Sequence, residues 1–290
     1  MSYRVINKII IPPIKCQGIK TKLINHINEN IEWNDNGCWI EPFLGSGVVL
    51  FNICPPKAIV SDTNNHIIDF YKAIQSNTIT PQITRDFLEV NGEKLKQLGE
   101  DYYYEKRQEF NKTKDSLLFL FLNRSCFNGM MRFNNKGEFN VPFCRKPQRF
   151  DKTYITKICN QVKNIQECMK DKDWTFLCQD YKDTINKANP NDFIYLDPPY
   201  IGRDTNYFSK WEEKDAIELT NILQDEKQNL NFAMSMWKEN AYRKNSYIYN
   251  YWNNYEMRDL PHFYFVGGKE SNRNSVIETL ILSKKNVDQE

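Results

Sequence analysis

One stretch of this sequence constrains the fold more than any other. It is an apolar run, Phe193-Ile194-Tyr195-Leu196, that leads directly into Asp197-Pro198-Pro199-Tyr200. A short apolar run bounded by turn residues is typical of a buried strand in a parallel sheet. The two prolines fix a stiff turn at the carboxyl end of that strand. Because open α/β sheets bind ligands at this end of their strands, the stretch predicts an α/β fold with a site at the turn.

The rest of the chain alternates between strand-like and helix-like segments on either side of a long interruption. This alternation predicts a parallel sheet with crossover helices on both of its faces. The expected elements, in chain order, are a strand at 38–40, a helix at 46–53, a strand at 57–61, a helix at 64–74, strands at 174–178, 193–196 and 231–236, a helix at 212–225 between the last two, and a closing strand at 279–282.

The interruption, from about residue 75 to residue 171, is mainly helical and charged. A hairpin-like stretch from Met131 to Val141 turns around Asn135-Lys136-Gly137. Between residues 124 and 149 six Lys and Arg side chains stand against Glu138 alone, and such a local excess of positive charge predicts contact with phosphates. We therefore expect a sheet domain built from 1–72 and 166–290, interrupted by a smaller domain at 73–165.

Two features of the N-terminal third favour a bound nucleoside. The stretch Glu41-Pro42-Phe43-Leu44-Gly45-Ser46-Gly47 lies between a strand and a helix, where glycines allow close backbone approach and the helix offers free N–H groups. Asp62 ends the next strand, a position from which a carboxylate accepts both hydroxyls of a ribose. Taken alone, the first is also compatible with an ordinary glycine turn, and Asp62 with a helix cap.

The Asp-Pro-Pro-Tyr turn suits methyl transfer to the exocyclic N6 of adenine. The lone pair of that amine is delocalised into the ring, so it attacks a methyl sulfonium poorly. The Asp197 carboxylate and the Pro198 carbonyl would accept its two hydrogens and leave the lone pair directed at the methyl group. Tyr200 would stack on the base, which must leave the duplex to be reached.

These motifs resemble the amino-methylating DNA methyltransferases, and among them the Dam-type adenine enzymes, over most of the chain. The resemblance implies a Rossmann-like S-adenosylmethionine-dependent methyltransferase sheet, with an inserted, mainly helical target-recognition domain that carries a β-hairpin. It implies double-stranded DNA as substrate and S-adenosylmethionine as cofactor. The catalytic residues that it implies are Asp197, Pro198, Pro199 and Tyr200. The cofactor-binding residues that it implies are Cys16, Lys20, Glu41, Pro42, Phe43, Gly45, Gly47, Asp62, Asp180, Tyr181 and Asp197.

The N-terminal stretch from Pro13 to Lys20 is similar to the family's Phe-x-Lys-Trp-x-Gly-Gly-Lys opening. Cys16 replaces the usual Trp, and Ile19 replaces the second Gly. By this similarity Lys20 lies near the cofactor and Asp197, and Lys15 reaches the DNA. A solvated lysine is the alternative interpretation of Lys15.

The stretch from Asn123 to Phe133, followed by Gly137 to Phe143, is similar to the family's target-recognition hairpin. The similarity implies that Phe127 wedges into the base stack and that Arg132 reads a base, since an arginine fork fits guanine O6 and N7. A core aromatic is the alternative for Phe127. The DNA-binding residues implied in full are Lys15, Arg124, Phe127, Asn128, Met130, Arg132 and Pro142.

Other classes of protein fit the sequence less well. The eight cysteines are scattered, with no C-x-x-C pair and only three histidines in the chain, so we expect reduced thiols and no metal site. We find neither a signal peptide nor a membrane span, which predicts a cytoplasmic protein. Cytosine-N4 methyltransferases usually carry Ser in place of Asp197. The other alternative is a catalytically silent DNA-binding relative.

The expected biological setting is a restriction-modification or phage system. In the first of these, a cognate restriction endonuclease is the expected partner, and the expected assembly is a monomer or weak dimer. The segments Ala233 to Arg243 and Pro261 to Thr279 resemble those of family members with nonpalindromic targets.

Overall fold

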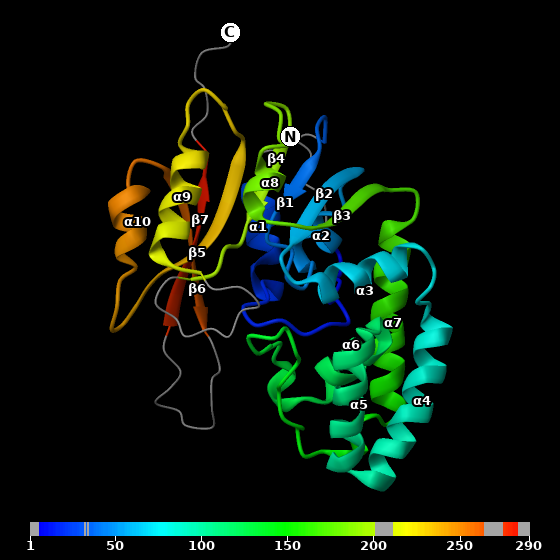
Figure 1. The fold of residues 1–290 in the computed structure, drawn as a ribbon. Coiled ribbons are helices and arrows are strands. Elements are labelled where there is room, and N and C mark those ends of the chain that lie inside the picture. The colour runs from blue at the N-terminus through cyan, green and yellow to red at the C-terminus, as the bar shows by residue number, and fades with distance from the viewer. Residues whose placement is uncertain (1–5, 32, 34, 201–210, 264–274, 284–290) are drawn as a thin grey trace.

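The computed structural model describes residues 6–200 apart from 32 and 34, together with 211–263 and 275–283. Within them, seven strands form one sheet in the order β3-β2-β1-β4-β5-β7-β6 (Figure 1). β7 runs antiparallel to both of its neighbours, and the other pairs are parallel. The prediction of an α/β fold is confirmed. The strands are β1 (Trp39–Glu41), β2 (Lys57–Asp62), β3 (Asp173–Cys178), β4 (Phe193–Leu196), β5 (Phe232–Asn240), β6 (Glu256–Phe263) and β7 (Ser275–Leu282).

Side chains alternate across the strands and build two separate cores, one on each face of the sheet. Trp39 and Tyr195 belong to the first core, whereas Ile40 and Ile194, their chain neighbours, belong to the second. The sheet is therefore flanked by helices on both faces, as predicted. The first core is covered by α1 (Ile24–Asn30), which follows the short 3-10 turn η1 (Thr21–Leu23), and by α2 (Val48–Ile53), α3 (Asn65–Gln75) and α7 (Lys152–Met169); the second is covered by α8 (Tyr181–Ile185), α9 (Glu213–Leu223) and α10 (Ser246–Tyr251).

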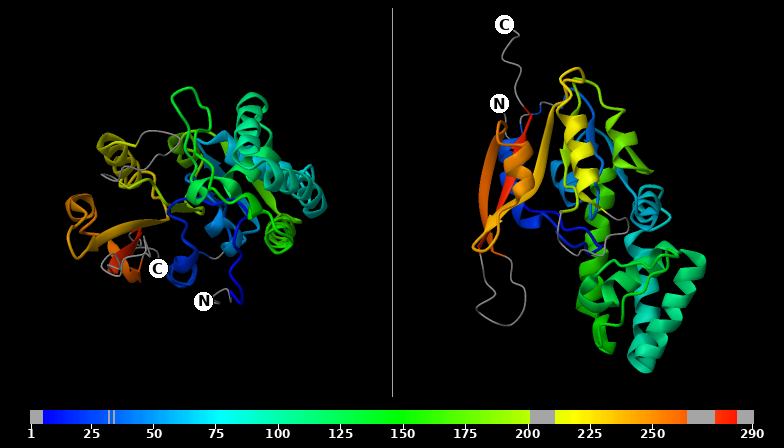
Figure 2. Two further views of the ribbon diagram at one scale, coloured as in Figure 1. Left: turned by 90° about the horizontal axis from the view of Figure 1, so that it is seen from below. Right: turned by 60° about the vertical axis from the view of Figure 1, so that its left-hand side comes forward.

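The last strands differ most from the sequence prediction. β6 was not predicted, because Glu256, Arg258 and Pro261 give it the composition of a loop. Charges and proline are typical of an edge strand, and β6 lies at the edge of the sheet, paired only with β7 among the described strands. Figure 2 shows this edge on the side of the molecule away from the inserted helices.

The inserted helices gather at one end of the molecule, below the sheet in the view of Figure 1. Their apolar side chains continue the first core, so the insertion packs directly against the sheet domain. Side chains of Thr80, Asp115 and Asp151 accept backbone N–H groups at the starts of three of these helices. The elements are α4 (Pro81–Leu98), α5 (Glu100–Thr113) and α6 (Ser116–Ser125), followed by the 3-10 turns η2 (Phe127–Gly129) and η3 (Pro147–Arg149).

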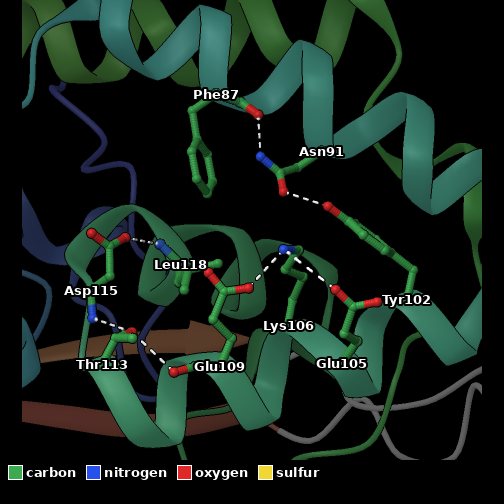
Figure 3. A network of polar contacts seen from close by, with 9 residues as sticks. All are labelled: Phe87, Asn91, Tyr102, Glu105, Lys106, Glu109, Thr113, Asp115 and Leu118. Carbon is green, nitrogen blue, oxygen red and sulfur yellow. Dashed lines mark hydrogen bonds and ion pairs between the residues drawn. The ribbon is translucent and has the colours of Figure 1, made fainter.

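A polar network, drawn in Figure 3, joins α4 to α5. The Tyr102 hydroxyl of α5 donates to Asn91 Oδ1 of α4 at 2.7 Å, and Asn91 Nδ2 donates to the Phe87 carbonyl at 2.8 Å. Farther along α5, Lys106 Nζ lies 2.7 Å from Glu109 Oε2. The buried amide and phenol are thus satisfied, which gives the insertion a defined internal packing.

The predicted hairpin exists, but it is held by a single bridge, between Phe133 and Phe139. Asn134 and Gly137 close its turn: the Gly137 N–H donates to the Asn134 carbonyl at 2.8 Å, with Gly137 at φ +70°. Tyr103 of α5 donates its hydroxyl to the Val141 carbonyl at 2.8 Å. The hairpin is therefore fastened to the helices behind it.

Among the described helices, none combines the length and apolarity needed to cross a membrane.

Candidate active site

The glycine loop and the Asp-Pro-Pro-Tyr turn lie side by side at the carboxyl edge of the sheet. β1 pairs with β4 in parallel register, Trp39 opposite Phe193, and its other neighbour is β2. The strand order therefore changes direction between β1 and β4, which is where open α/β sheets form a crevice. The loop after β1 and the turn after β4 both open onto this crevice.

The glycine loop has a backbone that only glycine adopts without strain. Gly45 has φ +51° and Gly47 has φ +71°. A Cβ on Gly47 would also lie 2.7 Å from the Phe51 ring, closer than side chains approach. The Leu44 N–H donates to the Ser61 carbonyl at 2.9 Å, and the Tyr71 hydroxyl donates to the Ser46 carbonyl. Strand β2 and helix α3 therefore fix the loop.

Asp62 holds the loop from the end of β2. Its Oδ2 accepts the Gly45 N–H at 2.8 Å, and its Oδ1 accepts the Asn64 N–H at 2.8 Å. Burial raises the pKa of Asp62, and the two N–H groups oppose that rise. The helix-cap interpretation of Asp62 is wrong, because the side chain of Asn64 caps α3 by accepting from His66. Each carboxylate oxygen keeps a further lone pair for a ligand.

Asp197 forms a buried ion pair with Lys20. The Lys20 Nζ lies 2.8 Å from Asp197 Oδ1 and donates to the Gly18 carbonyl at 3.0 Å. Lys20 is 3% exposed, whereas the Asp197 side chain is 25% exposed and therefore accessible to a ligand. Burial raises the pKa of Asp197, while the Lys20 ammonium lowers it and favours the ionised carboxylate.

Tyr200 is held from two sides. Its ring lies under the Lys20 ammonium, 5.1 Å from Nζ to the ring centroid, and its hydroxyl donates to Glu278 Oε2 at 2.8 Å. Glu278 is buried on β7 and was not predicted, because it lies one residue before the closing strand expected at 279–282. That position was itself a signal, since a buried carboxylate is costly unless it has a partner.

Glu41 joins Asp62 and Asp197 in an acidic cluster at this edge, and the neutral Cys16 thiol borders it. Glu41 is 2% exposed, its Oε2 accepts from Trp39 Nε1 at 3.0 Å, and burial raises its pKa to about 8. A Cβ on Gly45 would lie 3.6 Å from Cys16 Sγ, so Cys16 borders the glycine loop. Burial and then the nearby Asp62 and Asp197 raise the pKa of the Cys16 thiol to about 12. The cluster suits a ligand that carries positive charge.

Phe43 and Tyr181 form an aromatic wall beside the glycine loop. Their rings stack with centroids 5.3 Å apart. The Trp211 ring lies nearly perpendicular to the Phe43 ring, with centroids 5.6 Å apart. Tyr181 is buried and its hydroxyl donates to the Asp215 carbonyl at 3.2 Å. Asp180 caps α8 by accepting from the Lys182 N–H. Phe43, only partly buried, is the more accessible of the two stacked rings.

Residues 123–143, which resemble the family's target-recognition hairpin, expose some of the side chains predicted to bind DNA and bury others. Phe127 is 50% exposed, so the core-aromatic alternative is wrong. Asn128 and Pro142 are exposed beside it, and the Pro142 carbonyl accepts the Phe127 N–H at 2.8 Å. Met130 is partly buried. An exposed ring held by the backbone is available to a partner.

Arg132 is partly engaged within the hairpin. Its Nε donates to Asn140 Oδ1 at 2.7 Å, and one terminal amino group donates to the Asn140 carbonyl at 3.1 Å. Arg124, in contrast, is 4% exposed. It donates to Gln161 Oε1 at 2.8 Å, and its guanidinium lies 5.0 Å from the centroid of the Tyr154 ring.

Lys15 joins the N-terminal segment to the insertion. Its N–H donates to Asn123 Oδ1 at 2.7 Å and its carbonyl accepts from Asn123 Nδ2 at 2.9 Å. Its stem packs where a side chain on Gly129 would clash, at 2.3 Å. The side chain is half-buried, so a simple solvated lysine does not describe it.

Comparison with known proteins identifies the family. Residues 17–262 match the family described as D12 class N6 adenine-specific DNA methyltransferase. The chain belongs to this family. It is 32% identical over 211 residues to the type II methyltransferase M.MjaIII of Methanocaldococcus jannaschii, an alignment that covers 65% of this chain and 68% of the relative. It is also 35% identical to the DNA adenine methylase of Serratia marcescens, over 64% of this chain and 66% of the relative. It is 30% identical to the DNA adenine methylase of Haemophilus influenzae, over 75% of this chain and 76% of the relative.

Family membership agrees with the sheet topology and with the resemblance found in the sequence. The seven-stranded sheet is consistent with a Rossmann-like methyltransferase fold. In this adenine-specific methyltransferase family the cytosine-N4 alternative no longer stands. Residues 264–274, part of the segment that resembles enzymes with nonpalindromic targets, lie outside the described residues.

Proposed function

We propose that this methyltransferase transfers a methyl group from S-adenosylmethionine to N6 of adenine in double-stranded DNA. The observation that carries the proposal is the position of Asp197. Its carboxylate is accessible, paired with Lys20, and lies next to the glycine loop across the β1–β4 crevice. Family membership supports the base and the reaction.

The residues of the acidic cluster fit this cofactor. S-adenosylmethionine carries a sulfonium and an ammonium group, and when bound it supplies an electrophilic methyl group. Asp62 and Asp197 offer negative charge, Glu41 would ionise as a bound cation lowers its raised pKa, and Asp62 keeps lone pairs for the ribose hydroxyls. The backbone of Pro42, Gly45 and Gly47 would approach the ligand closely, and Cys16, Lys20 and Phe43 would line the same space. Asp180 and Tyr181 would border the adenine end.

The Asp-Pro-Pro-Tyr turn would act by holding the amine in place. The Asp197 carboxylate and the Pro198 carbonyl accept the two N6 hydrogens, which directs the nitrogen lone pair at the methyl carbon. The N–C bond forms as the S–C bond breaks, and the proton that N6 loses passes first to Asp197. No protein nucleophile is required, so positioning and hydrogen bonding supply the catalysis. Pro199 keeps the turn rigid.

Tyr200 would stack on the extruded adenine, with its ring orientation set by Glu278. The 2.8 Å hydrogen bond from the Tyr200 hydroxyl to Glu278 supports a fixed ring orientation. We assign Glu278 as a positioning residue, because it reaches the base only through Tyr200.

The inserted segment 73–165 would be the target-recognition domain, between catalytic parts 1–72 and 166–290. The exposed Phe127 is placed to wedge into the base stack, and Arg132 would exchange its Asn140 contacts for a guanine. Asn128, Met130 and Pro142 would contact the DNA beside them. The basic stretch around the hairpin and its fastening to α5 support this assignment.

Labelled methyl transfer tests the proposal. The full chain is incubated with duplex DNA and S-adenosylmethionine tritiated on the methyl group, and the nucleosides are separated after digestion. We expect label in N6-methyldeoxyadenosine; label in N4-methylcytosine, or none in DNA, would overturn the proposal. Long-read sequencing of DNA from expressing cells then gives the target sequence, and with it a restriction endonuclease of matching specificity can be sought.

A further inference from the structure

A cavity of about 420 Å³ lies between the N-terminal segment and the inserted helices, and Cys16 lies between it and the acidic cluster. One wall is the extended chain around Lys15, and the others come from the end of α6, from η2 and η3 and from α7. The charged and amide side chains that line it are Lys15, Arg124, Asn128, Arg149, Lys157 and Gln161, and Tyr154 lies among them.

The cavity is strongly positive. Four of its lining residues are cationic and none is acidic. Across the described residues, no carboxylate forms an ion pair with Lys15, Arg124, Arg149 or Lys157. Burial, and then the nearby Arg149 and Arg124, lower the pKa of Lys15. Cations brought together in this way repel one another unless an anion enters.

Arg124 shows where such an anion would bind. Its guanidinium is held against Tyr154 and Gln161, and its Nε is buried without a hydrogen-bond partner among the described residues. A buried donor without an acceptor is costly, by an amount comparable to a lost hydrogen bond. A tetrahedral oxyanion offers several acceptors to a planar guanidinium fork, which makes phosphate a good match for this group.

We propose that this cavity binds a single phosphate group of the DNA backbone. The proposal rests on the proposed function and names a contact with that substrate. DNA is the expected source because the cavity adjoins the segment proposed to recognise the target: Asn128 lines it, and the exposed Phe127 is the preceding residue. Asn123 binds the backbone of Lys15, so the phosphate site and the hairpin are joined by direct contacts.

Duplexes with one neutral methylphosphonate linkage, scanned along the target site, test the proposal. The pocket variant is Lys15→Gln with Lys157→Gln, since both side chains have ends that no described carboxylate holds and Gln keeps the Lys15 stem. The control is the Lys94→Gln variant, which changes an exposed lysine of α4 outside the cavity. For wild type and control we expect that neutralising one particular linkage weakens DNA binding about tenfold. In the pocket variant, neutralising the same linkage should weaken binding about twofold or less.

Salt dependence and free phosphate supply the other arms. Losing one phosphate contact reduces the slope of log affinity against log salt by about 0.9, whatever the DNA sequence. A pocket variant that stays sensitive at every linkage, with an unchanged slope, would overturn the proposal. Binding of inorganic phosphate that is lost in the pocket variant, but that leaves DNA affinity unchanged at constant ionic strength, would instead assign the cavity to free phosphate and overturn DNA as its source.

These binding measurements do not depend on methyl transfer. A chain that binds DNA through the cavity but transfers no methyl group would refute the proposed function and leave the phosphate site standing. A chain that methylates adenine, with no linkage sensitive to the pocket variant, would do the reverse.

Discussion

The carboxyl edge of the sheet and the cavity beside α7 are opposite in charge, although only four residues of chain separate Lys15 from Lys20. At the first, Lys20 meets Asp197 in a cluster that also contains Glu41 and Asp62. At the second, Lys15 faces Arg124 and Arg149, and no carboxylate is among the described residues that line the cavity. The contrast matches two partners of opposite charge, a cationic cofactor and a polyanionic DNA.

The two regions also differ in how they are built. The acidic cluster is assembled from strand ends and tight turns, so its groups are fixed by backbone hydrogen bonds such as those to Asp62. The basic cavity is assembled from helices and an extended segment, and its cations carry long side chains. We therefore expect substitutions at the first to act on cofactor binding and chemistry, and those at the second to act on DNA affinity.

The largest separable effect is expected from Asp62→Ala. The change releases the Gly45 and Asn64 N–H groups and removes the ribose acceptor. We expect the Kd for S-adenosylmethionine to rise about 100-fold, since hydrogen bonds to a charged group contribute about 1.5–3 kcal/mol each. Calorimetry measures this, with DNA affinity as the control. A variant that loses more affinity for DNA than for the cofactor would contradict the assignment of this region to cofactor binding.

Lys20→Met should act next most strongly. Without the ammonium at 2.8 Å, the pKa of Asp197 rises, so the carboxylate protonates at a higher pH. We therefore expect the acid limb of the single-turnover rate to move to higher pH, because the Lys20 ammonium no longer favours the ionised carboxylate. Rates measured from pH 5 to 9 decide this; an acid limb at the wild-type position would argue against the ion pair as a support for Asp197.

Arg132→Ala should relax target choice while leaving cofactor binding unchanged. Losing an arginine fork to guanine costs about 1–3 kcal/mol of discrimination, or roughly tenfold or more. Long-read sequencing of DNA methylated by the variant measures this. A methylation pattern identical to that of the wild type would count against a recognition role.

The smallest effect is expected from Glu41→Gln. With a pKa of about 8 in the free protein, Glu41 is mostly protonated at pH 7, and a bound cation would favour its ionised form. Cofactor binding should therefore release a proton and tighten as the pH rises toward 8, by at most tenfold per unit. In Glu41→Gln this dependence should be weaker. Calorimetry in two buffers of different ionisation enthalpy counts the proton; equal counts for both proteins would contradict the assignment.

Much of the fold could be predicted from the sequence because its strands are short apolar runs bounded by turn residues. The run from Phe193 to Leu196 was placed correctly, and β7 was predicted only from Thr279 although it begins at Ser275. β6 was missed because an edge strand shares the composition of a loop. The strand order could not be predicted, since it depends on pairing between segments far apart in the chain.

At the site, sequence motifs predicted the residue types better than their environments. The family resemblance predicted that Lys20 lies near Asp197, and in the structure the two side chains form an ion pair. The burial of Arg124 could not be read from its neighbours in sequence, because Tyr154 and Gln161 approach it from α7. Glu278 likewise became visible only when β7 was placed beside the turn that carries Tyr200.

The most direct test of the account is the single-turnover methyl transfer rate of Asp197→Ala and Asp197→Asn, measured with DNA and S-adenosylmethionine both saturating. Asn keeps the shape of the side chain and replaces one acceptor oxygen by a donor amide. We predict that both variants bind DNA within about threefold of wild type and lose about 100-fold to 1,000-fold or more in rate, the range seen when one transition-state contact is removed. Transfer at the wild-type rate in either variant would contradict the assignment of Asp197 as the group that holds the adenine amine.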